Sequence, residues 1–188
     1  MHQPPRVDDI IRHLDDLRTG TYEGAGGRGR REELFERACA LLDPVVRRVL
    51  AETDRLFLAS TGRAGHFTHT DGDGGRYAAW ELSWPRQRDA VARSGVQVPP
   101  IQVVAVFGAT NTHPHLRGTR AGDWPLQVTT EADALRQEPV VRAIVESELH
   151  QRIFEGGWTV VPSYADRHRD GRAGDQPDAS PAASPDAP

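Results

Sequence analysis

Residues 101–107 read Ile-Gln-Val-Val-Ala-Val-Phe, and this nearly continuous apolar run decides the fold prediction. A strand with apolar side chains on both faces is typical of the interior of a sheet. The preceding pair Pro99-Pro100 lacks the backbone N–H groups that a ladder needs, so it marks the point where the strand begins. We therefore predict a central strand over residues 101–107.

Two further strands are predicted before this run. Residues 76–84 (RYAAWELSW) indicate an aromatic-rich strand, and residues 55–60 (RLFLAS) are a short apolar run that ends at Thr61-Gly62. Between them, residues 65–75 contain the Asp-Gly and Gly-Gly pairs that are typical of a hairpin connection. We expect the two strands to pair antiparallel to each other. A last strand is predicted at residues 158–161.

Helices are predicted on both sides of the strands, because apolar residues recur there at intervals of three or four. Residues 7–18 form a short amphipathic helix, and the glycine-rich residues 20–29 after it indicate a flexible joint. Residues 30–52 form a second helix, with a bend or a restart at Asp43-Pro44. Residues 129–155 form a long helix that Thr129 or Thr130 caps and that restarts at Pro139.

The predicted order of elements indicates an α+β fold in which a short antiparallel meander is flanked by an N-terminal amphipathic helix and a long C-terminal helix. We divide the chain into three parts. Residues 1–29 hold the first helix and the joint, and residues 30–164 form the α+β domain. Residues 165–188 are rich in Asp, Arg, Pro, Ala and Ser, which predicts a disordered tail.

Composition narrows the functional classes. The formal net charge of −4 and the pI of about 6.1 make nucleic acid an improbable partner. All 23 basic residues are Arg, as in GC-rich bacterial coding, so chemistry that needs a lysine is excluded. The single cysteine, Cys39, lies among apolar residues of a predicted helix and is read as structural. Neither a signal pattern nor a membrane span is present in the sequence, so we expect a cytoplasmic protein.

Histidines offer the first candidate site. The predicted metal ligands are His66 and His69 beside the hairpin and His113 and His115 after the central strand. Imidazole is a usual ligand of zinc and other divalent transition metals, and loops held by strands are where such sites form. The alternative is a polar turn with solvated histidines. The pair of Glu146 and His150 is read as an i,i+4 contact on a solvated helix face.

A family resemblance offers the second candidate. Residues 74–85 form a Gly-Gly-x-aromatic strand that ends in Trp-Pro, and then come Pro99-Pro100, the strand 101–107 and His113-Pro114-His115. This order resembles that of the ubiquitin-conjugating enzymes, in which a His-Pro-Asn turn precedes the catalytic cysteine. The resemblance covers residues 30–126 and implies that residues 30–50 correspond to the first helix of that family.

The sequence departs from that family at the catalytic positions. His115 stands where the family has asparagine, and residues 116–126 contain no cysteine, so a thioester cannot form. The resemblance therefore implies a binding module without catalysis. The run 111–114 (NTHP) with Asp123 is also similar to the zinc motif of JAMM-type metallopeptidases, although Asn111 stands where that motif has its first histidine.

Two functions stay open at this point. The first is a non-catalytic module that binds another protein through the sheet edge and through His113, Pro114, His115 and Trp124. The second is a small metal-dependent enzyme of hydrolase type, in which His66, His69, His113 and His115 gather at one end of the sheet. The sequence leaves open which of the two applies, and hence whether the protein is an enzyme.

Overall fold

The computed structural model describes residues 5–111, 113–119 and 122–169 of the 188-residue chain. The helices of this part are α1 (Pro5–Thr19), α2 (Arg28–Phe57), α3 (Pro85–Asp89), α4 (Glu131–Gly156) and α5 (Pro162–Arg169), with a 3-10 turn η1 (Trp158–Val160). The strands are β1 (Arg63–Thr70), β2 (Arg76–Ser83), β3 (Ile101–Phe107), β4 (His115–Arg117) and β5 (Trp124–Pro125).

The strands form one antiparallel sheet in the order β1-β2-β3-β4-β5, which is a meander. β3 lies in the middle, as the apolar run 101–107 predicts, and it pairs with β2 from Leu82↔Ile101 to Arg76↔Phe107. The tight turn between β1 and β2 is closed where the N–H of Asp71 donates to the carbonyl of Gly75 at 2.8 Å. The α+β fold class with an antiparallel meander is thereby confirmed.

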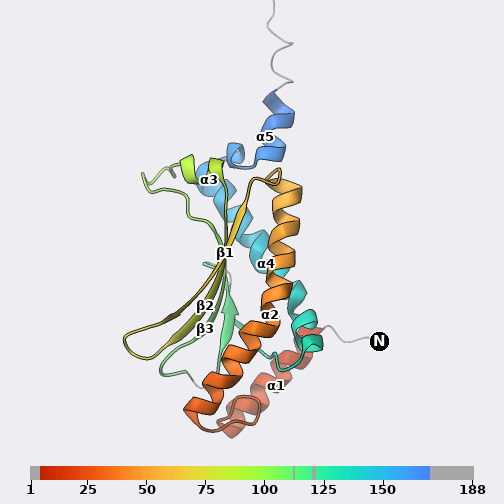
Figure 1. The fold of residues 1–188 in the computed structure, drawn as a ribbon, viewed down its shortest axis with the longest axis vertical. Helices are drawn as coiled ribbons and strands as arrows, with labels where there is room; N and C mark the ends of the chain where they lie inside the picture. Colours follow the sequence, from red (N-terminus) through yellow and green to blue (C-terminus); the bar gives the residue numbers. More distant parts are fainter. Residues whose placement is uncertain (1–4, 112, 120–121, 170–188) are drawn as a thin grey trace, which may run out of the picture.

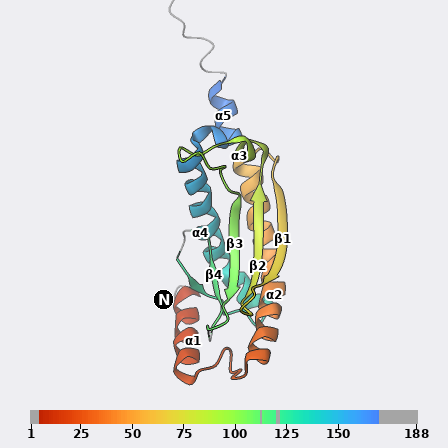
Figure 2. The same cartoon turned by 90° about the vertical axis from the view of Figure 1, so that its left-hand side faces the viewer.

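Helices α2 and α4 lie against the same face of the sheet and against each other, as Figures 1 and 2 show. The core between these two layers is made of apolar side chains from alternate positions of β2 and β3 and from one face of each helix. Its largest members include Trp80, Leu82, Ile101, Phe107, Leu42 and Leu50, all at most 1 % exposed. The opposite face of the sheet carries half-buried residues such as Tyr77 and Gln102.

Two predicted strands are wrong. The run 55–60 is the end of α2, which continues to Phe57 and is followed by Ala59 and Ser60 at φ of 55° and 57°. Residues 158–161 begin with the 3-10 turn η1 after Gly157, which has a φ of 80°. A short apolar run has no periodicity that separates a strand from a buried helical segment, so both errors have the same cause.

The structure also corrects the predicted hairpin and the predicted helix breaks. β1 includes residues 63–70, so only residues 71–75 form the connection. Pro44 and Pro139 lie inside α2 and α4, neither of which restarts there. A proline inside a helix removes one hydrogen bond at a cost of about 3 kcal/mol. Extensive packing of both helices on the sheet offsets this cost.

Residues 5–29 are held to the domain more firmly than a flexible joint implies. Tyr22 is fully buried, and its hydroxyl donates to the carbonyl of Leu126 at 2.9 Å. At the other end, α5 extends to Arg169, so residues 165–169 are helical and not part of a disordered tail. Residues 170–188 of that predicted tail lie outside the described residues. Within the described ranges, no helix has the length and apolar character needed to cross a bilayer.

Candidate metal centre

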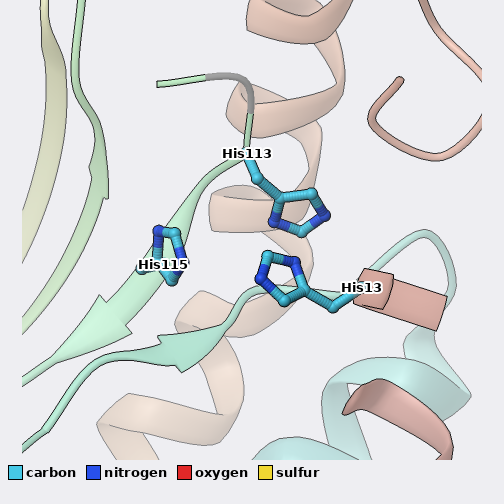
Figure 3. Close-up of side chains that lie close together, drawn as sticks. All are labelled: His13, His113 and His115. Carbon is cyan, nitrogen blue, oxygen red and sulfur yellow. The ribbon is translucent and has the colours of Figure 1, made fainter. Parts of the chain in front are cut away.

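Three histidines from two distant parts of the chain converge beside β4. His13 comes from α1, His113 from the segment before β4, and His115 is the first residue of β4. Each ring offers one nitrogen, and these three nitrogens lie within 4.8 Å of one another. Figure 3 shows the rings of the three residues turned toward a common space.

The segment that carries two of these histidines is fixed by its neighbours. His115 pairs with Val106 of β3 on one side and with Pro125 of β5 on the other. Pro114 is buried, and its carbonyl accepts the N–H of Leu126 at 3.2 Å. The loop after β3 is therefore pinned at its proline, and His113 points inward with 2 % of its surface exposed.

Nε2 of His113 faces more acceptors than Nδ1 does, and the proton is therefore assigned to Nε2. Its Nε2 lies 3.2 Å from Oδ2 of Asp16 and 2.9 Å from the amide of Gln127. That amide is satisfied when its oxygen faces His113, because the same oxygen then also accepts the main-chain N–H of His13 at 3.2 Å. Two acceptors at Nε2 place the proton there. Nδ1, which is 3.1 Å from the carbonyl of Pro114, then keeps a lone pair.

All three imidazoles are held in the neutral form. Burial and, to a smaller degree, the nearby ring of His13 lower the pKa of His113 to about 4 against the opposing effect of Asp16. Burial and the neighbouring His115 likewise lower the pKa of His13, and burial lowers the pKa of His115. A neutral imidazole has the lone pair that a metal ion requires. At neutral pH the three residues are therefore ready to bind a metal.

His13 has an unsatisfied atom at the centre of the cluster. Its Nδ1 is buried and has no hydrogen-bond partner among the described residues. The centroid of its ring lies 4.1 Å from that of His113 and 5.5 Å from that of His115, in edge-to-face geometry. Because a buried polar atom usually has a partner, this nitrogen indicates a group that the protein alone does not supply.

The four histidines of the sequence prediction do not converge. His113 and His115 belong to the cluster, whereas His66 and His69 lie on β1. The register places His69 opposite Tyr77, Tyr77 opposite Val106, and Val106 opposite His115. These are three strand spacings of about 4.8 Å, or roughly 14 Å, which is too far for a shared metal. His66 instead stacks on Trp80, and His69 contacts Asp71 at 3.0 Å.

His13 is the ligand that sequence reasoning missed. It lies on the same side of α1 as the polar residues Asp9, Arg12 and Asp16, and all four contact the domain or the cluster. A histidine three residues before an aspartate on the polar side of a helix is a common pattern on solvated surfaces. The only available signal was therefore too general to single it out.

The predicted protein-binding loop is mostly inaccessible. His113 and Pro114 are buried, and His115 and Trp124 are half-buried. Of the four residues of the predicted docking face, only His115 and Trp124 reach the surface, and the binding role of this loop stays a prediction. The loop and the start of β4 position two of the three histidines of the cluster, His113 and His115.

A separate groove lies between α2 and β1. Its volume is about 500 Å³, and its lining includes Cys39, Asp43, His66, His69 and Tyr77. Burial raises the pKa of Cys39 to about 12, which excludes a thiolate nucleophile there. The reading of Cys39 as a structural residue agrees with this environment.

Comparisons of the chain with protein-family models, with curated proteins and with solved structures found no match. The functional argument therefore rests on the geometry of the site. The resemblance to the ubiquitin-conjugating enzymes stays a prediction.

Proposed function

We propose that this protein is metal-dependent and that His13, His113 and His115 bind one divalent transition metal ion, zinc by preference. The observation that carries the proposal is the convergence of three imidazole nitrogens within 4.8 Å, on residues whose burial keeps them neutral. The unpartnered Nδ1 of His13 supports the same conclusion.

The geometry fits zinc after small movements. A tetrahedral zinc site has Zn–N distances of about 2.0–2.1 Å, which sets the nitrogens roughly 3.3 Å apart. Binding would require side-chain rotations of His13 and His115, which are half-buried, to bring the nitrogens from their present spread to that separation. With the proton on Nε2, Nδ1 of His113 has no hydrogen bond to the carbonyl of Pro114 to give up, so its lone pair is available to the metal.

Asp16 and Gln127 supply the supporting contacts that a metal ligand of this kind needs. A ligating histidine usually donates its other N–H to a carboxylate or carbonyl, which fixes the ring and raises its basicity. His113 does so through Nε2. Hydrogen bonds from the N–H of Glu23 and from the hydroxyl of Thr21 hold the Asp16 carboxylate in place, at 3.0 Å each.

Three protein ligands leave one coordination position for water. A zinc ion in such a site lowers the pKa of bound water to about 7, which is the basis of hydrolytic metal catalysis. We therefore assign the protein to the hydrolase type among metal-dependent proteins.

Metal analysis of protein purified without a histidine tag tests this proposal. Inductively coupled plasma mass spectrometry should find about one equivalent of zinc or a related metal after reconstitution. Competition with a chromophoric chelator should show that H13A and H115A each lose most of the affinity. The variant D16N should lose about 10-fold to 100-fold, because it removes a supporting contact and no ligand.

The matched controls are H66A, H69A and H150A, which remove exposed histidines outside the cluster. These three variants should bind metal as the wild type does. Circular dichroism and urea unfolding of H115A show whether its fold is retained. Unchanged binding by both H13A and H115A, or loss of binding by H66A or H69A, would contradict the proposal.

A protein-binding role is the second candidate, and the exposed strand β1 favours it. β1 is the outer strand of the meander, and all eight of its residues are exposed. An unpaired edge accepts an extended segment of another protein by strand addition. The groove of about 500 Å³ beside this edge offers space for side chains of such a segment. The resemblance to a ubiquitin-conjugating fold without its cysteine points to the same class of function.

A charged substitution on the edge strand β1 tests the protein-binding role. A partner isolated with the full chain should bind the purified F67K variant at least 10-fold more weakly in isothermal titration calorimetry, because edge lysines oppose strand addition. V96K is the control, since Val96 is an exposed apolar residue far from β1 in the sequence. Equal affinity of the partner for the wild type and for F67K would rule out binding at this edge.

A further inference from the structure

Helix α1 is turned with its polar side inward. Asp9 and Asp16 are 5 % and 8 % exposed, although both carry charge. Asp9 accepts a hydrogen bond from the side chain of Gln137 at 2.7 Å, and Arg12 bonds to Asp133 at 3.3 Å and to Glu23. Polar contacts therefore attach this helix to the body of the protein, in contrast to α2 and α4.

The apolar side of the same helix faces away from the body. Its members are Ile10, Ile11, Leu14 and Leu17, which are 43 %, 49 %, 58 % and 49 % exposed. Helical spacing places them on one stripe centred on Leu14. Figure 2 shows α1 at the periphery of the molecule, at its lower end, where the helix contacts α4 and β5. A contiguous apolar stripe of this kind on a helix marks an interaction surface.

We propose that this stripe binds the same stripe of a second copy of the chain, so that two α1 helices pack antiparallel about a twofold axis. The stripe is self-complementary when Leu14 lies at the axis. Ile11 then lies opposite the partner's Leu17, and Ile10 lies opposite the partner's Arg18. An interface of this type uses the same patch on both subunits, as a twofold axis requires.

The charges beside the stripe match this arrangement. Asp8 and Arg18 are exposed, and Arg18 contacts Asp15 of its own helix at 3.4 Å. In the antiparallel pair, Arg18 lies opposite the partner's Ile10. The partner's Asp8 is two residues, or about 3 Å, farther along the helix axis and on the same side of the interface. Opposite charges thus meet at both ends of the apolar stripe. This charge pattern fixes the direction of the pairing.

A second copy suits the stripe better than a membrane surface does. Helices that lie on anionic bilayers carry basic residues along the borders of their apolar face. Here the acids Asp8 and Asp15 border the stripe, and among the described side chains Arg18 is the one basic residue beside it. Because one helix from each copy covers less than the ~800 Å² per partner of a standard interface, we expect a dissociation constant in the micromolar range.

Sedimentation equilibrium of the full chain tests the proposal. The wild type should show a monomer–dimer equilibrium, and L14E should raise the dissociation constant at least 10-fold. D8R and R18D should each weaken the dimer several-fold, and the double variant D8R/R18D should recover most of the affinity. All measurements are made with a chelator present, so that the result does not depend on the metal centre.

V96E is the matched control, because Val96 is 64 % exposed and lies outside α1. It should dimerise as the wild type does. Circular dichroism verifies that L14E keeps its helix content, as expected for an exposed position. A wild type that stays monomeric at ~500 μM, a dimer that L14E leaves unchanged, or a monomer that co-sediments with anionic phosphatidylserine vesicles would each overturn the proposal.

Discussion

Glu148 and Arg152 lie on successive turns of α4, and each side chain is 1 % exposed. Oε1 of Glu148 accepts the N–H of Thr119 at 2.7 Å, while Arg152 donates to the carbonyl of Pro100 at 2.9 Å. Thr119 follows β4 and Pro100 precedes β3. The ion pair therefore ties α4 to the ends of two strands, and each member compensates the buried charge of the other.

Removing one member of this pair should destabilise the fold strongly. We expect E148A to lower the free energy of unfolding by about 3–5 kcal/mol, because it removes the nearer carboxylate of a buried guanidinium, which then keeps Glu155 at 3.6 Å as its acidic partner. Urea denaturation measures the change. E146A is the control on an exposed position of the same helix and should stay within about 0.5 kcal/mol of the wild type. Similar losses in the two variants would show that the pair contributes nothing specific.

The beginning of α4 illustrates how a helix end is stabilised. Thr130 is the N-cap, and its hydroxyl accepts the N–H of Asp133 at 3.1 Å. In return, Oδ2 of Asp133 accepts the N–H groups of Thr129 and Thr130 at 3.0 and 2.9 Å. Burial raises the pKa of Asp133, but these hydrogen bonds outweigh it and lower the pKa to about 2.

This lowered pKa predicts a pH dependence of stability. The unfolded Asp133 takes up a proton near pH 3.8, whereas the folded one does so near pH 2, so the unfolded state binds more protons between these values. The carboxylate therefore contributes about 2 kcal/mol above pH 4, and this contribution disappears as the pH falls toward 2.

Urea unfolding of D133N, measured between pH 2 and 7, checks this. The difference in unfolding free energy between the wild type and D133N should be about 2 kcal/mol at pH 7 and should shrink toward zero at pH 2. E131Q, which changes an exposed acid in the same turn, should differ little from the wild type at any pH. A difference that does not vary with pH would contradict the assigned pKa.

Helices and strands were predictable where a pattern extends over many residues. The periodicity of α2 and α4 and the apolar run of β3 identified these elements, since burial on one face or on both leaves a repeating signal. The runs 55–60 and 158–161 are too short to carry such a signal, and their neighbours in space decide the conformation. Alternation could not reveal β1 either, because all of its residues are exposed.

The histidine cluster was predictable only in part, because its members come from parts of the sequence that are about 100 residues apart. His113 and His115 are neighbours in the sequence and point to one site by themselves. His13 joins them across about 100 residues, and the contact between Asp16 and His113 spans 97. A contact between residues so far apart in the sequence leaves no periodicity and no motif that could predict it. The apolar stripe of α1 was visible in the sequence, but its outward orientation was not.

Helix α1 and the segment after it should open before the rest of the molecule. They are attached mainly through polar contacts and one buried ring, which involve Asp9, Arg12, Asp16 and Tyr22. Few buried apolar contacts hold this helix, so its amides are expected to exchange with solvent long before those of α2 and α4. We therefore expect residues 5–27 to open as one cooperative unit. An ion bound between His13 and β4 would couple that local opening equilibrium to the supply of metal in the cell.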